Sequence, residues 1–487
     1  MISNFDKAIK GVSSQLIVTI AIGVFEIISF SIMSRILSPQ DFGYYNAVLA
    51  IVTIFASFSD TGIGSAIIQK KNADVHYLNN AFSLSFIFAV IISLVLIISS
   101  GFLSKTFIVA EMKTPMMLMS ITLFLNCMSS ISLSILQKKL KFLSIGVIRL
   151  VSIVVTTIMA VFLALKGFGY YAILTKAILS SVIVCCLSYS IAGIHFRFEI
   201  NRVYFKSIFG FSGWLMASVF FRNLSSQIDR VLMPRLLSVS ALGEYSRPKE
   251  FISQVSDKTN GIFDSVLFPI LSSIQDDYSA LANAFKKSFF LMNLLASFLF
   301  CLFIFNSNLI IRLFLGVNWI HLSPIFIILS VDILFNVEGR LSDCFLRGLA
   351  MTRQQFIFRI IEALFKIISV VIGSSWGIKG VALAIAFSES LVRIVKVFFV
   401  SHIISIPINN TISLYFKSCK WTILFIPIII ILKFFVPSGI HGEIIIFMST
   451  ISLAIIIFVF CPRFVGSYYY ENVYLLLMNR VKILFNR

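Results

Sequence analysis

Residues 35–45 read Arg-Ile-Leu-Ser-Pro-Gln-Asp-Phe-Gly-Tyr-Tyr, and residues 235–245 read Arg-Leu-Leu-Ser-Val-Ser-Ala-Leu-Gly-Glu-Tyr. Without a gap, the two stretches share the positions Arg35/Arg235, Leu37/Leu237, Ser38/Ser238, Gly43/Gly243 and Tyr45/Tyr245. Each copy follows one long apolar segment and precedes another. Internal repeats of this size are typical of secondary transporters, so the pair predicts a duplicated polytopic membrane protein. The alternative is a chance match between two turn-like loops, in which Ser and Gly are common.

The first copy has the chemistry of a helix–turn–helix connection. Pro39 disfavours continuation of the preceding helix. Ser38 or Asp41 is suited to cap the next helix, and Gly43 permits a close backbone approach. We therefore interpret the repeat as a connection that identifies the fold and carries no chemistry of its own.

The composition is that of a membrane protein. Of the 487 residues, 59% are hydrophobic and only 13% are charged, whereas an ordinary soluble domain is about 25% charged. The first apolar segment lacks a small-residue cleavage site, so we expect it to be retained as a span. The net charge of +19 is explained by basic cytoplasmic loops, by an anionic substrate or by anionic lipids.

Apolar runs of about 20 residues predict the membrane spans. They lie near residues 11–34, 44–68, 79–103, 114–136, 145–165, 170–193, 208–234, 247–272, 286–311, 322–346, 356–377, 379–403, 418–436 and 443–462. The expected fold is an all-α polytopic membrane protein with about 14 transmembrane helices, of which the first twelve form two pseudo-symmetric six-helix lobes. The expected parts are a lobe at 1–194, a cytoplasmic linker at 195–207, a second lobe at 208–403, and two further helices with a basic tail at 404–487.

The connecting segments indicate the orientation. Basic residues are about twice as numerous on the side that holds the N-terminus, which predicts that both termini are cytoplasmic. The segments 195–207 and 463–487 mix basic and aromatic residues, and we expect them to form membrane-surface helices. The cysteines lack CxxC spacing and the histidines are scattered, so neither a metal site nor a cofactor is expected.

Ionised side chains inside predicted spans are costly, so they are expected to face the bundle interior or a water-filled cavity. Arginine and lysine in such a cavity suit a polyanion such as a pyrophosphate. The basic candidates for substrate binding are Arg149, Lys176, Arg222, Arg230 and Arg340. The acidic candidates for ion coupling or gating are Glu26, Asp60, Asp229, Asp257 and Asp264.

The alternative for each of these charges is a salt bridge between helices that holds the bundle together. Glu362 with Lys366, and Glu389 with Arg393, lie four residues apart and therefore on one helical face. Residues near span ends, such as Arg230, have the further alternative of reaching toward the membrane surface.

The motifs resemble those of a known family. Leu37-Ser-Pro-x-x-Phe-Gly-x-Tyr45, then an apolar run to Asp60-x-Gly62 and Gln69, resembles the N-terminal signature of Wzx-type flippases. These are lipid-linked oligosaccharide exporters of the multidrug/oligosaccharidyl-lipid/polysaccharide superfamily. Leu242-Gly-x-Tyr245 with Phe268-Pro269 is similar to the same family. In this resemblance Asp60 matches the acidic position of the signature, and Asp229 and Arg230 precede the second motif.

The resemblance implies two six-helix lobes around a central cavity in the bacterial inner membrane, with about 14 transmembrane helices, or 12 as the alternative. It implies export of undecaprenyl-pyrophosphate-linked repeat units to the periplasmic leaflet by alternating access, for O-antigen, capsule or exopolysaccharide. Membrane lipids are expected partners. Polysaccharide polymerase machinery is a further candidate partner, and nucleic acid is not expected to bind. The chain has no P-loop, so direct use of ATP is not expected.

The rival functions are distinguished by charge and loop length. A multidrug or cation antiporter of the same superfamily favours an acidic cavity with few cations. A membrane polymerase or ligase acting on the same lipid-linked sugar needs a sizeable extracellular loop. A structural scaffold needs no buried charges in both halves. We therefore expect a transporter without enzymatic activity.

Overall fold

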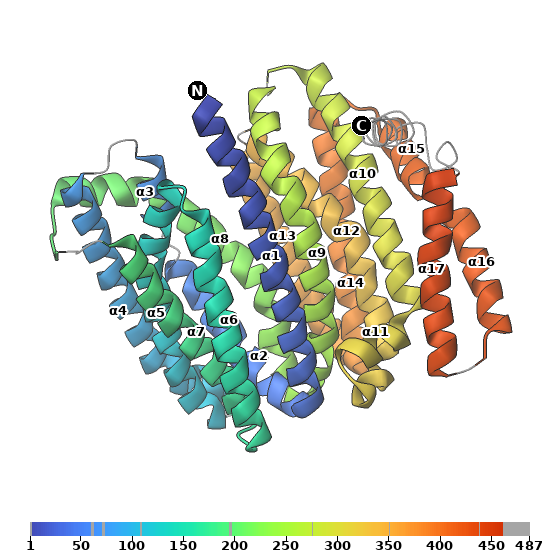
Figure 1. Cartoon of the computed structure of the whole chain (residues 1–487), viewed down its shortest axis with the longest axis horizontal. Helices are drawn as coiled ribbons and strands as arrows, with labels where there is room; N and C mark the ends of the chain where they lie inside the picture. The colour runs from blue at the N-terminus through green and yellow to red at the C-terminus, as the bar shows by residue number, and fades with distance from the viewer. Residues whose placement is uncertain are drawn as a thin grey trace. The chain divides into compact units, whose positions relative to one another are not determined.

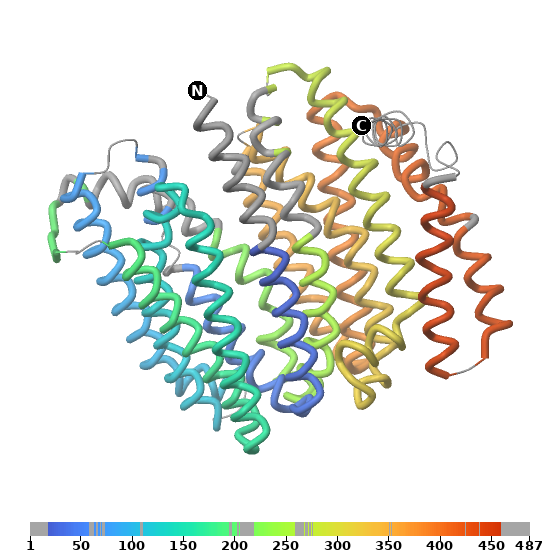
Figure 2. Tube along the Cα trace, viewed as in Figure 1, coloured from blue at the N-terminus to red at the C-terminus, as the bar shows by residue number. Residues whose placement is uncertain are grey.

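The computed structural model describes residues 2–59, 63–70, 74–107, 110–193, 197–274, 276–349, 351–437 and 439–460 (Figure 1). Figure 2 shows the same chain as a tube along its Cα trace. Helices account for nearly all of the described residues (Figure 1). The chain divides into two compact units, Met1–Ser246 and Arg247–Arg487. The division falls within one long helix and differs from the linker expected at 195–207. The lobe boundaries expected from the repeat stay a prediction.

The first unit holds the helices that precede this division. They are α1 (Ile2–Ile36), α2 (Pro39–Ser59), α3 (Ile63–Gln69), α4 (Val75–Phe107), η1 (Ala110–Met112), α5 (Lys113–Lys138), α6 (Phe142–Leu165), α7 (Tyr170–Ala192), α8 (Arg202–Leu236) and the start of α9 (Val239–Ser273). Helix α5 packs on α4 and α7, α6 packs on α1 and α7, and α2 packs on α8. Small hydroxyl residues lie in these contacts, as is usual between membrane helices. The hydroxyls of Ser132 and Ser188, for example, join α5 to α7 at 2.6 Å.

The second unit continues from α9. It contains α10 (Tyr278–Phe305), α11 (Ser307–Phe314), η2 (Val317–Leu322), α12 (Ser323–Gly348), α13 (Thr352–Ser374), α14 (Gly377–Ile403), α15 (Ile408–Cys419), α16 (Thr422–Phe435) and α17 (Ile440–Phe460). Helix α14 packs on α12 and α13, and α10 packs on α12. Trp421, which is fully buried, donates its indole N–H to Ser297 Oγ at 3.0 Å, so the large ring is buried without leaving its polar atom unpaired.

Within the described residues, the expected spans lie over helices. In the described part of the chain, eight helices are long and apolar enough to cross a membrane: Val18–Ile36, Val75–Phe107, Lys113–Lys138, Phe142–Leu165, Tyr170–Ala192, Tyr278–Phe305, Val317–Gly348 and Ile440–Phe458. The protein is therefore an all-α polytopic membrane protein. Helices α2, α8, α9, α13, α14 and α16 also lie at expected span positions. Their crossing of the membrane stays a prediction.

Two expected segments differ from the structure. The single span expected over 286–311 is divided at Asn306, because α10 ends at Phe305 and α11 begins at Ser307. The linker expected as a membrane-surface helix is non-helical over residues 197–201. There the backbone N–H groups of Arg197, Glu199 and Asn201 donate to side-chain oxygens of Asn79, Ser83 and Asn80 on α4, at 3.1, 2.8 and 2.6 Å. These hydrogen bonds replace the helical ones.

The linker is also joined to α4 by a side chain. Glu199 accepts a hydrogen bond from Asn79 Nδ2 at 2.7 Å, and its other oxygen lies 2.9 Å from His76 Nδ1. The hydrogen bonds from His76 and Asn79 hold the pKa of the Glu199 carboxyl below its ordinary value. The carboxylate therefore stays ionised and bound to the start of α4.

The two copies of the repeat have the same helix boundaries. Helix α1 ends at Ile36 and α2 begins at Pro39, while α8 ends at Leu236 and α9 begins at Val239. The duplication predicts this register.

Capping is also shared between the copies. In the first copy, Ser38 Oγ accepts from the Asp41 N–H at 3.2 Å and Asp41 Oδ2 accepts from the Ser38 N–H at 3.0 Å, which is a reciprocal cap. In the second, Ser238 Oγ accepts from the Ala241 N–H at 3.0 Å. The capping expected at Ser38 and Asp41 is confirmed.

The two turns contact each other through their shared glycines. A Cβ atom on Gly43 would lie 1.8 Å from the carbonyl oxygen of Val239, and a Cβ atom on Gly243 would lie 1.7 Å from that of Pro39. Since 39 corresponds to 239 and 43 to 243 in the repeat, the two contacts are equivalent. The copies therefore cross around a local pseudo-two-fold axis, at a distance that only glycine allows.

Candidate functional site

In the first unit, Lys176 joins three helices. Its ammonium on α7 donates to Ser29 Oγ on α1, and the same hydroxyl accepts from Thr157 Oγ1 on α6 at 3.1 Å. Arg149 is exposed on α6, and Glu26 is half-buried on α1. The structure thus places Lys176 inside a helix contact and leaves the Arg149 side chain accessible.

Three further candidates of this unit lie on α8. Asp229 is fully buried and accepts a hydrogen bond from Tyr245 Oη at 3.0 Å. Tyr245 is one of the positions shared by the two repeat copies. Its hydrogen bond to Asp229 joins α8 to the start of α9. Arg222 is exposed, and half-buried Arg230 contacts Gln227 at 3.5 Å.

Two candidates lie outside what the structure describes. Asp60 falls in the gap between α2 and α3, and the side chain of Asp264 falls among the side chains that are not described. Their expected roles in coupling or gating stay predictions.

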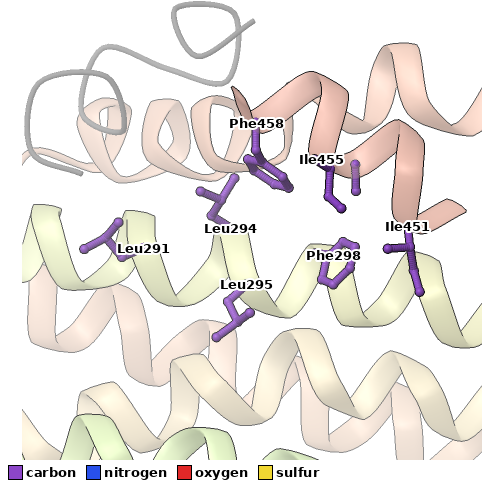
Figure 3. A pocket seen from close by; sticks show the side chains of 8 residues that line it. Leu291, Leu294, Leu295, Phe298, Ile451, Ile455 and Phe458 are labelled. Carbon is purple, nitrogen blue, oxygen red and sulfur yellow. The ribbon is translucent and has the colours of Figure 1, made fainter. Parts of the chain in front are cut away.

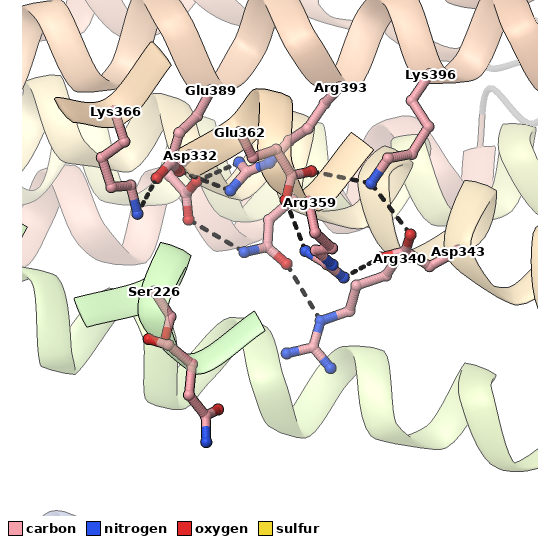
Figure 4. Close-up of polar contacts among 12 residues, drawn as sticks. Ser226, Asp332, Arg340, Asp343, Arg359, Glu362, Lys366, Glu389, Arg393 and Lys396 are labelled. Carbon is pink, nitrogen blue, oxygen red and sulfur yellow. Dashed lines mark hydrogen bonds and ion pairs between the residues drawn. The ribbon is translucent and has the colours of Figure 1, made fainter. Parts of the chain in front are cut away.

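The second unit contains a network of ion pairs between α12, α13 and α14 (Figure 4). Lys366 on α13 pairs with Glu389 on α14 at 2.5 Å. Glu389 also pairs with Arg393 at 2.7 Å, one turn further along the same helix. Arg393 in turn pairs with Asp332 on α12. Each of these side chains is less than a quarter exposed.

A second part of the network is centred on Lys396. This side chain is 1% exposed and contacts Asp343 at 3.1 Å and Glu362 at 2.9 Å. Arg359 pairs with the same two carboxylates, at 2.7 Å for Glu362. Figure 4 shows Lys396 between the two acids. The two bases and two acids therefore compensate one another where α12, α13 and α14 meet.

The network extends to Arg340 and Asp257, which the sequence assigned to different roles. Asn336 on α12 donates to Asp332 at 3.3 Å and accepts from Arg340 Nε at 3.3 Å. An Arg340 Nη group then pairs with Asp257 on α9. This pair is the most exposed of those joining α9 and α12–α14, at 34% for Arg340 and 56% for Asp257.

These contacts support the salt-bridge alternative for much of the charge in α12–α14. Removal of one partner from a buried pair costs about 3–5 kcal/mol, because the other charge is left uncompensated. An exposed pair contributes only about 0–1 kcal/mol. The buried bases are therefore committed to structural partners, whereas the Arg340–Asp257 pair is easily separated.

The helical spacing predicted some partners and not others. Glu389 and Arg393 pair as their four-residue spacing suggests. Glu362 and Lys366 have the same spacing, but each pairs across to α14. Arg359 was missed as a network member, although its place three residues before Glu362 inside an expected span was a signal for it.

Glu338 is a further buried acid on α12. It is 2% exposed and accepts a hydrogen bond from Tyr415 Oη on α15 at 2.7 Å. The contact fastens α15, which lies after the expected second lobe, to α12. Among the described residues, no group of three or more His, Cys, Asp or Glu side chains is placed to hold a metal ion.

A separate cavity of about 370 Å³ lies between α10 and α17 (Figure 3). Its lining is apolar and consists of Leu291, Leu294, Leu295, Phe298, Ile451, Ala454, Ile455 and Phe458. With no charged side chain in its lining, this cavity suits hydrocarbon and is unsuited to a phosphate or a sugar.

This chain is similar to proteins of polysaccharide biosynthesis. The family model described as "Polysaccharide biosynthesis protein" matches residues 32–324. The succinoglycan biosynthesis transport protein ExoT of Rhizobium meliloti is 24% identical over 69% of this chain and 68% of its own length. The lipopolysaccharide biosynthesis protein WzxC of Escherichia coli is 22% identical over 81% of this chain and 80% of its own length.

Solved structures share the fold. The lipid II flippase MurJ, in an inward closed conformation, has a TM-score of 0.67 and 18% identity, covering 91% of this chain and 98% of MurJ. A multidrug resistance MATE family transporter, in an inward-facing conformation, has a TM-score of 0.65 and 13% identity, covering 79% of this chain and 94% of the transporter. At these identities the likeness establishes the architecture alone.

Proposed function

Because this chain belongs to the polysaccharide biosynthesis protein family, we propose that it moves undecaprenyl-pyrophosphate-linked oligosaccharide repeat units across the bacterial inner membrane. The observation that carries the proposal is family membership over more than half of the chain, in a protein with the fold of a lipid flippase. The relatives' names, which include a succinoglycan transport protein and a putative O-antigen transporter, support the same substrate class.

The mechanism is alternating access. The pyrophosphate and sugars enter a polar cavity while the polyprenyl chain stays in the lipid, and the protein opens to one side of the membrane and then to the other. No covalent bond is made or broken, so the protein needs no catalytic residue and is not an enzyme. Membrane lipids are its surroundings, polysaccharide polymerase machinery is a downstream partner, and both termini lie in the cytoplasm.

The proposed substrate-binding residues are Arg149, Lys176, Arg222, Arg230 and Arg340. Among them, Arg149 and Arg222 have exposed side chains, and Arg340 is one-third exposed. Their accessibility supports contact with a dissolved anionic group. Lys366 on α13 and Arg393 and Lys396 on α14 are further basic residues, but acids hold them in ion pairs. The acids Glu26, Asp60, Asp229, Asp257 and Asp264 remain the proposed coupling or gating groups.

The antiporter alternative shares the fold, since a MATE transporter has a TM-score of 0.65 with this chain. A cation substrate would favour acids that are free to bind it. In the α12–α14 network, however, Asp332, Asp343, Glu362 and Glu389 are each paired with a base. This charge balance favours the flippase.

The Arg222→Ala and Arg340→Ala variants are expected to lower surface polysaccharide by about 10- to 100-fold, because a hydrogen-bonded charge contributes about 1.5–3 kcal/mol. The measurement is complementation of a strain that lacks this protein and makes the cognate lipid-linked oligosaccharide, with inserted protein quantified in parallel. Arg353→Ala removes an exposed base at the start of α13 and is the matched control, with wild-type export expected. Normal export by both Arg222→Ala and Arg340→Ala contradicts the assignment of these residues.

A further inference from the structure

The ion pair between Arg340 and Asp257 differs from the rest of the network in its exposure. Lys396 is 1% exposed and Lys366 is 7% exposed, so their acids are enclosed. Asp257 and Arg340 are 56% and 34% exposed. A charge that faces hydrocarbon is costly, so an exposed pair on helices of a membrane protein faces water or headgroups. Anions dissolved in that water reach Arg340.

The guanidinium of Arg340 is held by Asn336 at its Nε atom and pairs with Asp257 through a terminal nitrogen. Its Nε donates to Asn336 Oδ1 at 3.3 Å, and Asn336 donates a hydrogen bond to Asp332. The Nε end of the guanidinium is therefore held in place. Its Nη2 donates to Asp257 Oδ1. A phosphate oxygen accepts from a guanidinium in the same way as a carboxylate oxygen does. An incoming anion can therefore take the position of the Asp257 carboxylate while Asn336 keeps the guanidinium oriented.

Charge decides which anion prevails. A carboxylate brings one negative charge, whereas a diphosphate brings two or more, and both match the planar fork of arginine. Exposed carboxylate–guanidinium pairs are weak and screened by water. The carboxylates around Lys396 are enclosed and each is shared between two bases, so the same anion does not displace them.

We propose that Asp257 is a built-in competitor for the substrate's diphosphate at Arg340. This inference rests on the proposed function and adds that Asp257 regulates anion binding at Arg340. Without substrate, the Asp257 carboxylate occupies the guanidinium and ties α9 to α12. When the diphosphate binds, Asp257 is released and the tie between the two helices is broken. When the diphosphate leaves, Asp257 takes Arg340 again, so the site does not retain its product.

The test is a titration of purified full-length protein in detergent with inorganic pyrophosphate, followed by calorimetry. Asp257→Asn is expected to bind pyrophosphate about fivefold more tightly than wild type, because the competing exposed pair is gone. Arg340→Gln and the double variant Asp257→Asn/Arg340→Gln are expected to bind at background level. Asp276→Asn, which removes an exposed acid between α9 and α10, is the matched charge control and is expected to bind as wild type does.

The inference is overturned if Asp257→Asn binds no more tightly than wild type, or if Asp276→Asn gains as much. It is also overturned if the gain persists without Arg340. Size-exclusion chromatography checks folding of each variant. Should Arg340→Gln fail that check, Arg340→Lys replaces it, because it keeps the charge, loses the fork and is expected to bind more weakly than wild type.

A parallel export assay separates this inference from the proposed function. If wild type restores surface polysaccharide and Asp257→Asn shows no gain in binding, the function stands and the competition is refuted. If wild type restores none while Asp257→Asn binds pyrophosphate more tightly through Arg340, the proposed function fails and the competition for an anion stands.

Discussion

Substitution of Gly43 or Gly243 by alanine is expected to lower the free energy of unfolding by about 3 kcal/mol or more, at the upper end of overpacking effects. The new Cβ atom would lie 1.8 or 1.7 Å from a backbone carbonyl oxygen of the other repeat copy. A side chain can rotate away from such a clash, but a backbone carbonyl cannot, so the two helix–turn–helix connections must separate. The measurement is the thermal unfolding of purified protein in detergent.

Gly101→Ala is the matched control for this prediction. Gly101 also lies within a helix, and its Cβ atom would meet Lys113 at 3.9 Å, which is an ordinary contact. The double variant Gly43→Ala/Gly243→Ala is expected to lose less stability than the sum of the single variants, because the first substitution already separates the turns. Unfolding of Gly43→Ala at the same temperature as Gly101→Ala contradicts the close crossing.

Substitution of Lys396 by methionine is expected to cost about 3–5 kcal/mol of unfolding free energy, the range for breaking a buried ion pair. Methionine fills a similar volume but leaves Asp343 and Glu362 with Arg359 as their remaining basic partner. The second substitution Glu362→Gln, added to Lys396→Met, is expected to restore part of the loss because it removes one uncompensated carboxylate. Chemical or thermal unfolding of the three variants measures the coupling.

The exposed Arg340–Asp257 pair provides the comparison for the stability loss expected of Lys396→Met. Asp257→Asn breaks a pair that is more than one-third exposed on both sides, and it is expected to cost at most about 1 kcal/mol. If Lys396→Met is as stable as Asp257→Asn, the α12–α14 network does not hold the helices together in the way proposed here.

Hydropathy predicted the helices well, because a span needs a long apolar run whatever it packs against. It could not predict the break between α10 and α11, since residues 286–311 stay apolar on average across it. The cap at Ser38 was predictable because its chemistry is local: the hydroxyl and its backbone partner lie three residues apart. The reciprocal contact of Gly43 with the second turn was not, since it depends on how distant helices pack.

In the candidate site, too, local features were predictable from the sequence and contacts between distant helices were not. A charge inside an expected span marked Asp257, Arg340 and Lys366 as unusual from sequence alone. The partner of each charge was beyond reach, because Lys366 pairs with Glu389 on the next helix and Arg340 pairs with Asp257 on α9, far away in the sequence. Assigning Arg340 to substrate and Asp257 to gating separately therefore missed that the two act as one pair.

The central claim is translocation of a lipid-linked oligosaccharide, and the most direct measurement is the leaflet in which that intermediate lies. Spheroplasts are prepared from cells that make the intermediate, with and without this protein, and the sugar is probed from the periplasmic face with a membrane-impermeant reagent. Translocation by this protein predicts that the intermediate is protected in cells without it and becomes accessible when it is expressed. Equal accessibility in both cell types, with the intermediate left unpolymerised without the protein, would contradict a flippase and favour a polymerase or ligase.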